Sequence, residues 1–311
     1  MDVKFNSTTG AVELYSYVPA ATPAWAFIGL FAVGTFAHFI ALIPLRAPYF
    51  IPLIIGGICE SFGYYGRVWS SRSPHLVKPF VLQNLLILTA PVFIAATIYM
   101  SLSRLIRALN AEHLSPIKTK LISRIFILTD ILCFCTQIGG AGVQITGDAN
   151  IMRIGNIVVL CGLVFQICMF VWFLSLARRF HIRLQRDPTR VAEMLRWGKF
   201  FWALYVVGFV VLLRNMVRVI EFAEGEDGFV KSHEAMLYVF DAFLMCFVVY
   251  GFGVVHPSWL VRKARRAELS LMARNSLDTM TEILVPREEG EVKEYRGVGE
   301  NSRALEVRLG E

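Results

Sequence analysis

Long apolar runs separated by short polar stretches dominate the chain and predict a bundle of membrane-spanning helices. A helix needs roughly 20 mostly apolar residues to cross the hydrocarbon core of a bilayer, which is about 30 Å thick. Runs of this length occur at about 23–45, 49–69, 79–102, 121–145, 154–177, 199–221 and 235–256. Because the runs are continuous and do not alternate with period two, they exclude the strands of a membrane barrel. The expected fold class is an all-α polytopic membrane protein with seven transmembrane helices.

The same pattern divides the chain into four parts, namely an N-terminal segment (1–22), the seven-helix domain (23–257), an amphipathic segment (258–274) and a tail (275–311). The stretch SWLVRKARRAELSLMAR after Pro257 repeats basic and apolar residues at roughly helical spacing. It is typical of an amphipathic helix on the inner leaflet, although a plain solvated juxtamembrane segment is also compatible. The tail is rich in Glu and Arg and poor in large apolar residues, which predicts disorder from Asn275 onward.

Lys and Arg are distributed unevenly over the connections, and this predicts the orientation. The connections after the third, fifth and seventh runs are the most basic, with Arg104, Arg178 and Arg262 among many others. Short cytoplasmic loops carry the excess of positive residues, so we expect the N-terminus outside and the C-terminus in the cytoplasm. Asn6 opens an Asn-Ser-Thr sequon in the segment expected outside, which predicts N-glycosylation there.

Polar residues within the apolar runs are the informative positions, since a charge near the bilayer centre costs about 2.5–3.5 kcal/mol on insertion scales. These residues are Glu60, Tyr64 and Arg67 in the second run, Gln83 in the third, Asp130, Gln137 and Gln144 in the fourth, Gln166 in the fifth, Arg214, Arg218 and Glu221 in the sixth, and Asp241 in the seventh. Within a run, spacings of three, four or seven residues place such side chains on one face of a helix. We therefore expect polar stripes that face protein rather than lipid.

Two interpretations of the stripes are open. In the first, the carboxylates Glu60, Asp130 and Asp241 neutralise the arginines of the second and sixth runs and fix the helix register. Those arginines and Glu221 are then structural charge partners. In the second, the stripes line a cavity whose carboxylates bind a cationic or zwitterionic amphiphile. A single set of residues is able to serve both purposes.

Composition agrees with the membrane prediction and excludes other classes. The chain is 56% hydrophobic and 18% charged, against roughly 45–50% and about 25% in soluble domains. Its net charge of +7 comes from short clusters between apolar runs, not from a basic face that would bind nucleic acid. The six cysteines lie within apolar runs without zinc-site spacing, so we expect no metal. The chain has no GxSxG, HExxH, P-loop or GxGxxG motif, so neither catalysis nor a cofactor is expected.

Several intramembrane motifs follow one another in an order that is specific when taken together. They are Glu60-x-x-Gly63-Tyr64-x-x-Arg67, Gln83-x-x-Leu86, Ala90-Pro91, Ala95-Ala96-x-x-Tyr99, Phe126-x-x-x-Asp130, Gln137-x-x-Gly140-x-Gly142, Gly155, Gly162-Leu163, Gln166, Arg214-x-x-x-Arg218-x-x-Glu221 and Glu234-x-x-x-Tyr238-x-x-Asp241. Over about 20–260 the chain resembles the fungal RTA-like family of seven-span, lipid-translocating exporters. The resemblance implies a role in lipid transport and in resistance to toxic amphiphiles. Some members look like exporters of sphingoid long-chain bases, and others are tied to sterol-like toxicants or haem.

We therefore predict a membrane protein that exports or translocates amphiphilic lipids, sphingoid long-chain bases or sterol-like toxicants, and so confers resistance to them. The candidates for binding the ammonium group are Glu60, Asp130 and Asp241, and those for the hydroxyls are Gln137, Gln83 and Tyr64. The expected partners are membrane lipids and an amphiphilic lipid substrate, without nucleic acid. The plasma membrane is the expected location, with the endoplasmic reticulum or vacuolar membrane as alternatives.

The alternative function belongs to another class, a seven-span lipid sensor or receptor. Such a protein regulates membrane lipid asymmetry and stress signalling without transporting lipid. The basic cytoplasmic face and the amphipathic segment fit it equally well. However, the third run ends without a DRY-type motif and the seventh lacks NPxxY, which disfavours a G-protein-coupled receptor.

Overall fold

The computed structural model describes residues 4–5, 12–13, 19–143, 149–224 and 228–284. Nearly all of them are helical, as the sequence predicts for a polytopic membrane protein. The others form the short turns and loops between helices and two strands of two residues each, β1 (Lys4–Phe5) and β2 (Val12–Glu13), which pair antiparallel. Asn6 and Gln144 lie outside the described residues.

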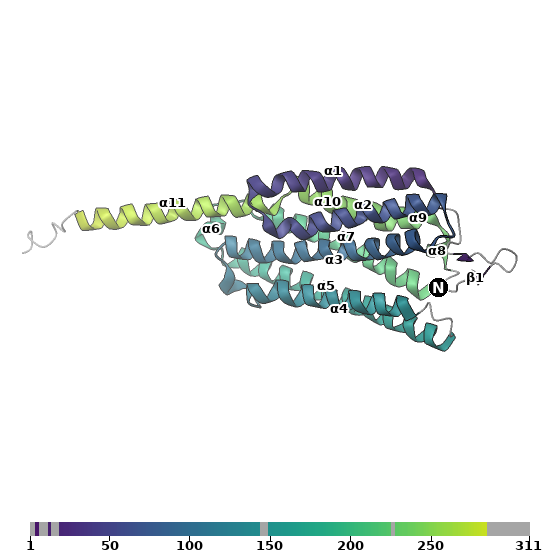
Figure 1. Ribbon diagram of the computed structural model, residues 1–311. Coiled ribbons are helices and arrows are strands. Elements are labelled where there is room, and N and C mark those ends of the chain that lie inside the picture. The colour runs from purple at the N-terminus through teal and green to yellow at the C-terminus, as the bar shows by residue number, and fades with distance from the viewer. Residues whose placement is uncertain (1–3, 6–11, 14–18, 144–148, 225–227, 285–311) are drawn as a thin grey trace, which may run out of the picture. The chain divides into compact units, whose positions relative to one another are not determined.

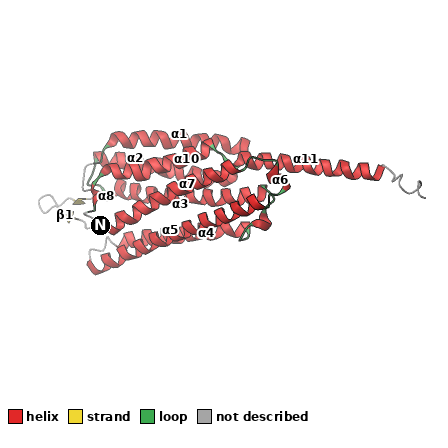
Figure 2. Ribbon diagram, turned by 180° about the vertical axis from the view of Figure 1, so that it is seen from behind, coloured by secondary structure: helices red, strands yellow, loops and turns green. Residues whose placement is uncertain are grey.

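The helices of the bundle run lengthwise beside one another (Figures 1 and 2). The long helices are α1 (Ala21–Leu45), α2 (Ile51–Arg72), α3 (Val77–Ala108), α4 (Thr119–Val143), α5 (Ala149–Arg186), α7 (Gly198–Glu224), α10 (Leu244–Val254) and α11 (Pro257–Leu284). The short helical segments are η1 (Pro48–Phe50), η2 (Glu112–Leu114), α6 (Arg190–Glu193), α8 (Phe229–Ser232), α9 (Glu234–Leu237) and η4 (Tyr238–Phe243). Of these, η4 is a π-helix that connects α9 to α10. The chain forms two compact units, Met1–Ala264 with the bundle and Arg265–Glu311 with the end of α11.

Six stretches of the described chain are long and apolar enough to cross a membrane. They are Ala21–Leu45, Val77–Ala108, Thr119–Gly140, Arg153–Arg186, Gly198–Glu224 and Glu234–Leu277. The predicted second span, 49–69, is absent from this set although α2 is a continuous helix there. Glu60, Arg67 and several glycines and serines lower its hydropathy. Its 22 residues nevertheless give a length of about 33 Å, enough to cross a hydrocarbon core of about 30 Å.

The end of α11 differs from the sequence prediction. The helix continues to Leu284, whereas the sequence predicts a disordered tail from residue 275. The segment NSLDTMTEIL contains Leu, Met and Glu, which have high helix propensity and favour continuation of the helix. Residues 285–311 lie outside the described part of the chain.

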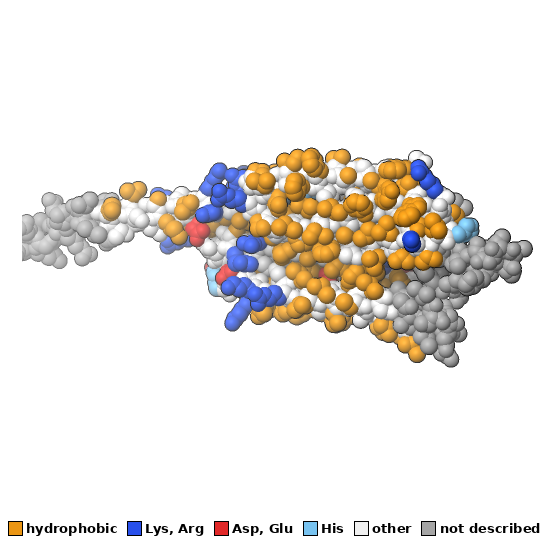
Figure 3. All heavy atoms as spheres, in the orientation of Figure 1, with side chains coloured by type: hydrophobic (Ala, Val, Ile, Leu, Met, Phe, Trp, Pro, Cys, Tyr) orange, Lys and Arg blue, Asp and Glu red, His pale blue; other side chains and the backbone are white. Residues whose placement is uncertain are grey.

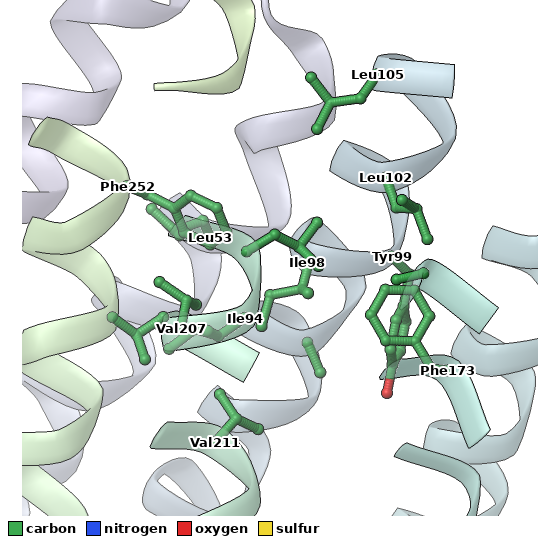
Figure 4. Packing of buried hydrophobic residues seen from close by; sticks show 14 of the residues in the cluster. Leu53, Ile94, Ile98, Tyr99, Leu102, Leu105, Phe173, Val207, Val211 and Phe252 are labelled. Carbon is green, nitrogen blue, oxygen red and sulfur yellow. The ribbon is translucent and has the colours of Figure 1, made fainter. Parts of the chain in front are cut away.

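The interior of the bundle is apolar and tightly packed. Figure 4 shows Leu53 of α2, Ile94 and Ile98 of α3, Val207 of α7 and Phe252 of α10 converging on one core. Large apolar side chains also face outward over the middle of the helices, while Lys and Arg gather at the end that includes α6 (Figure 3). This distribution matches a bilayer with an apolar core and polar boundaries.

Two glycines allow close contact between neighbouring helices. A Cβ on Gly66 of α2 would lie 3.0 Å from the backbone nitrogen of Gln83 in α3. A Cβ on Gly140 of α4 would meet Val159 and would lie 2.8 Å from the carbonyl oxygen of Gly155 in α5. Small residues at such crossings let helix backbones approach closely, which is how helices associate in membranes.

A buried charged cluster as candidate functional site

Three segments, α2, α7 and the stretch from α9 through η4, bring ionisable side chains into one largely buried group. The charged cluster consists of Glu60, Tyr64, Arg67, Arg214, Arg218, Glu221, Glu234, Tyr238 and Asp241. Its members on α2 and on α7 are spaced four and three residues apart, so each helix presents them on one face. The sequence therefore determines the stripes, and helix packing brings them together.

Asp241 is the most heavily paired carboxylate of the charged cluster. Its Oδ1 accepts from Arg214 Nε at 2.7 Å and lies 3.3 Å from Arg218 Nη2. Its Oδ2 accepts from the Tyr64 hydroxyl at 3.5 Å. Asp241 lies in the π-helix η4, and π-helical turns occur frequently at functional sites. The spacing of polar residues along the sequence contains no signal for this wider turn.

Arg67 pairs with Glu234. The sequence places Glu234 in a family motif, but it is not among the predicted site residues. Arg67 Nη2 lies 2.7 Å from Glu234 Oε1, and Arg67 Nε donates to the Tyr238 hydroxyl at 2.9 Å. Glu234 Oε1 also accepts from the backbone N–H of Ala20 at 2.8 Å. These bonds tie α2, α9 and the start of α1 together. The remaining pair joins Arg218 Nη1 to Glu221 Oε2 at 3.1 Å within α7.

A proline in α3 supplies a further acceptor for the charged cluster. Pro91 lies inside α3 and has no N–H, so it leaves the carbonyl oxygen of Ile87, four residues earlier, without its usual helical donor. Arg214 Nη2 donates to this same oxygen at 3.3 Å. The Ala90-Pro91 motif thus has a local structural reason, because it frees a backbone acceptor for a buried guanidinium.

Glu60 differs from every other carboxylate of the charged cluster. Its side chain is fully buried, and neither carboxylate oxygen has a hydrogen-bond partner among the described residues. The expected neutralisation of Glu60 by an arginine is not what the structure shows, because Arg67 pairs with Glu234 and Arg214 with Asp241. Buried polar groups are normally satisfied, so an unpartnered buried carboxylate is an exception that needs a physical explanation.

A second unpartnered group lies nearby on the α1–α2 interface. The hydroxyl of Thr35 in α1 is buried without a hydrogen-bond partner among the described residues. It faces Gly57 of α2, directly against the position that a Cβ would occupy. Gly57 and Glu60 are three residues apart and share one face of α2. Sequence reasoning missed Thr35, because a lone threonine in an apolar run carries no distinguishing pattern.

The polar residues of α3, α4 and α5 form a separate group. The amide cluster consists of Tyr99, Asp130, Gln137 and Gln166, all of them buried. The Tyr99 hydroxyl donates to Asp130 Oδ2 at 2.9 Å, and Gln137 Nε2 donates to Gln166 Oε1 at 3.1 Å. No ion pair in the described part of the chain joins Asp130 to an arginine, which differs from the expected neutralisation. Five of the six predicted binding residues therefore fall into two groups, with Glu60, Tyr64 and Asp241 in the charged cluster and Asp130 and Gln137 in the amide cluster.

Gln83, the predicted residue of α3, lies beside α2 rather than in the amide cluster. It is buried, and its backbone packs against Gly66. On the other side of α2, Phe31 stacks on Tyr64 at a centroid distance of 6.0 Å, and Phe27 stacks on Tyr238 at 5.7 Å. These aromatic rings of α1 pack against the two tyrosines of the charged cluster.

Comparison with known proteins places this arrangement in a family. The family model described as "RTA1 like protein" matches residues 53–264. The chain belongs to the RTA1-like family. The family resemblance of the intramembrane motifs is thereby confirmed. The matched range contains the whole charged cluster and the whole amide cluster, whereas Thr35 precedes it.

Three curated relatives of this RTA1-like chain from Saccharomyces cerevisiae cover most of its length. Protoporphyrin uptake protein 1 is 34% identical over 206 residues, which cover 66% of the chain and 67% of that protein. Protein RTA1 is 32% identical over 293 residues, covering 85% of the chain and 90% of that protein. Sphingoid long-chain base transporter RSB1 is 27% identical over 258 residues, covering 71% and 67%. No solved structure matches the chain.

Proposed function

We propose that this protein is a membrane carrier that exports sphingoid long-chain bases or similar cationic amphiphiles and so confers resistance to them. The names of its relatives support lipid-related membrane transport or resistance as the broader role. The observation that carries the narrower proposal is Glu60, a fully buried carboxylate without a hydrogen-bond partner among the described residues. A site with a carboxyl group that no arginine of the protein pairs with favours a cationic ligand over an anionic one, because a nearby positive charge stabilises the ionised form.

The chemistry of a sphingoid base fits the groups around Glu60. Its ammonium pairs with the Glu60 carboxylate, and its hydroxyls bond Thr35 and Tyr64. Asp241 is already engaged by Arg214 and Arg218, so it acts here as a charge partner rather than as a ligand.

The amide cluster is a second binding position for the polar headgroup, where Asp130 and Gln137 contact it. Gln83 contacts the headgroup closer to α2. The acyl chain lies along the apolar helix surfaces. This scheme needs no catalytic step and no cofactor.

We also propose a topology and a location for the protein. With α2 as a seventh span, the N-terminus lies outside and the C-terminus in the cytoplasm, in the plasma membrane. Asn6 then carries an N-linked glycan. A helix with buried charge, such as α2, is accommodated because neighbouring helices surround its polar face.

Reconstitution tests the carrier proposal directly. Purified protein in liposomes should move labelled sphingosine between leaflets faster than protein-free liposomes do. Glu60→Gln should lower the protein-dependent rate about tenfold or more, because it removes the charge that pairs with the ammonium. Ser61→Ala is the matched control, since Ser61 Oγ donates to the carbonyl oxygen of Gly57 within α2 at 2.9 Å. Unchanged movement and unchanged cellular resistance in Glu60→Gln would show that the proposed site is wrong.

A lipid sensor is the second candidate function, and α11 favours it. This helix carries exposed Trp259, Leu269 and Met272 together with several arginines, a combination suited to a membrane surface or a regulatory partner. In the same liposomes, binding of sphingosine without any protein-dependent movement would support the sensor and reject the carrier.

A further inference from the structure

The charged cluster is electrically balanced without Glu60. Its three arginines, Arg67, Arg214 and Arg218, pair with Glu234, Asp241 and Glu221. Three positive and three negative charges therefore cancel, and Glu60 remains as a fourth carboxylate.

The groups that face Glu60 from every neighbouring element leave it without a dedicated counter-charge. On α2 these are Cys59 and Tyr64, and on η4 and α10 they are Asp241 and Cys246. From α7, Arg214 and Arg218 act on Glu60 through space, but both bond Asp241 instead. The buried residues of α1 and α3 that pack against Gly56, Gly57 and Gly63 in this part of α2 include Thr35, Ile87, Ala90 and Ile94, and Phe31 stacks on Tyr64; none of these five side chains is ionisable.

A carboxylate in this position has two favourable states. Burying an ionised carboxylate without a partner is very unfavourable, so in the absence of a cation the group is neutral and holds a proton. When a ligand cation enters, the ion pair replaces the O–H bond and the proton leaves. A proton and a cation therefore exclude one another at Glu60.

We propose that Glu60 exchanges one proton for one substrate cation, so that lipid export is coupled to proton entry. This inference rests on the proposed carrier function and identifies its energy source. In the first half of the cycle the Glu60 O–H bond breaks, the proton passes to water, and the carboxylate pairs with the ammonium. In the second half the ammonium leaves on the other side, and Glu60 takes a proton from water there. One positive charge moves each way, so the exchange is electroneutral.

Proton release on binding is the direct test. N,N,N-trimethylsphingosine serves as the probe, because its fixed positive charge neither gains nor loses a proton. The protein in lipid nanodiscs, in weakly buffered solution with a pH indicator, should release about one proton for each bound probe. Glu60→Gln should release none and bind about tenfold or more weakly. Glu60→Asp, which keeps the carboxylate, should restore release, and Ser61→Ala should behave as the unmodified protein.

A transport measurement separates this inference from the carrier proposal. Liposomes with equal pH on both sides report simple exchange of the probe, and liposomes with a pH gradient report coupling. Accumulation of the probe on the acid side, together with proton release on binding, supports the inference. Exchange at equal pH without accumulation or proton release overturns it and leaves the carrier intact. Proton release without any flux supports exchange at Glu60 and rejects the carrier, while neither binding nor flux rejects both.

Discussion

At the scale of single residues, Asp241 and Glu60 show how neighbouring carboxylates acquire opposite properties. Both are buried, but Asp241 contacts two arginines and a tyrosine, whereas Glu60 has no hydrogen-bond partner among the described residues. Removing one member of a buried ion pair leaves an uncompensated charge, which is strongly destabilising. Removing an isolated carboxylate leaves nothing unpaired. The two residues should therefore respond differently to the same chemical change.

The comparison of Asp241→Asn with Glu60→Gln is the first residue-scale prediction. Asp241→Asn should lower the free energy of unfolding by about 3–5 kcal/mol, since Arg214 and Arg218 lose their shared counter-charge. Glu60→Gln should leave stability unchanged or raise it. Denaturant or thermal unfolding of the detergent-solubilised protein measures both.

An exposed pair supplies the control for this prediction. Arg107 and Glu112 lie 3.9 Å apart, with 38% and 56% of their side chains exposed. Glu112→Gln should change stability by less than about 1 kcal/mol, as expected for a surface ion pair. If Glu60→Gln destabilised the protein as strongly as Asp241→Asn, Glu60 would have a structural counter-charge and the unpartnered description would be incorrect.

At the scale of helices, departures from regular α-helix position the charged cluster. The π-helix η4 carries Asp241, and Pro91 in α3 frees the Ile87 carbonyl oxygen for Arg214. Close helix crossings at glycines hold the surrounding elements in register. In the GGAG stretch of α4, Gly140 faces α5, whereas a Cβ on Gly139 would have no atom within 4 Å.

These adjacent glycines provide a matched pair of variants. Gly140→Ala should destabilise the protein by about 1–3 kcal/mol, because the new methyl group would press on Val159 and on the Gly155 backbone of α5. Gly139→Ala should be neutral or stabilising by up to about 1 kcal/mol through helix propensity alone. Thermal unfolding of the two variants side by side measures the difference in stability. If both substitutions changed stability equally, Gly140 would not be the point of close contact between α4 and α5.

At the scale of the whole molecule, the number of spans decides which side each terminus occupies. Six stretches of the described chain satisfy length and hydropathy, and α2 lies alongside them with 22 residues, enough for one span, but with more polar residues. An even number of spans puts both termini on one side, and an odd number puts them on opposite sides. The proposed topology uses α2 as the seventh span.

Glycosylation together with terminal tags tests that topology. The protein expressed in a fungal host should lose electrophoretic mobility through a glycan at Asn6, and endoglycosidase treatment or Asn6→Gln should restore it. In intact cells a C-terminal tag should be inaccessible to antibody, while an N-terminal tag should be accessible. Both termini on the same side would reduce the number of spans to an even value.

The sequence by itself determined the class of fold and the inward stripes of this protein. Twenty-residue apolar runs have one favourable state in a bilayer, so six spans and the helical path of α2 follow from length and hydropathy. Helical spacing likewise places Glu60, Tyr64 and Arg67 on one face. These features are local along the chain, and local sequence encodes them.

Only the tertiary structure decided which charges meet. Arg67 pairs with Glu234, 167 positions away, and Arg214 pairs with Asp241 through a π-helical turn. Three carboxylates and three arginines therefore satisfy one another, and Glu60 is the carboxylate left over. Pairing depends on how helices rotate and cross, which is set by packing between distant segments rather than by the pattern within any one of them.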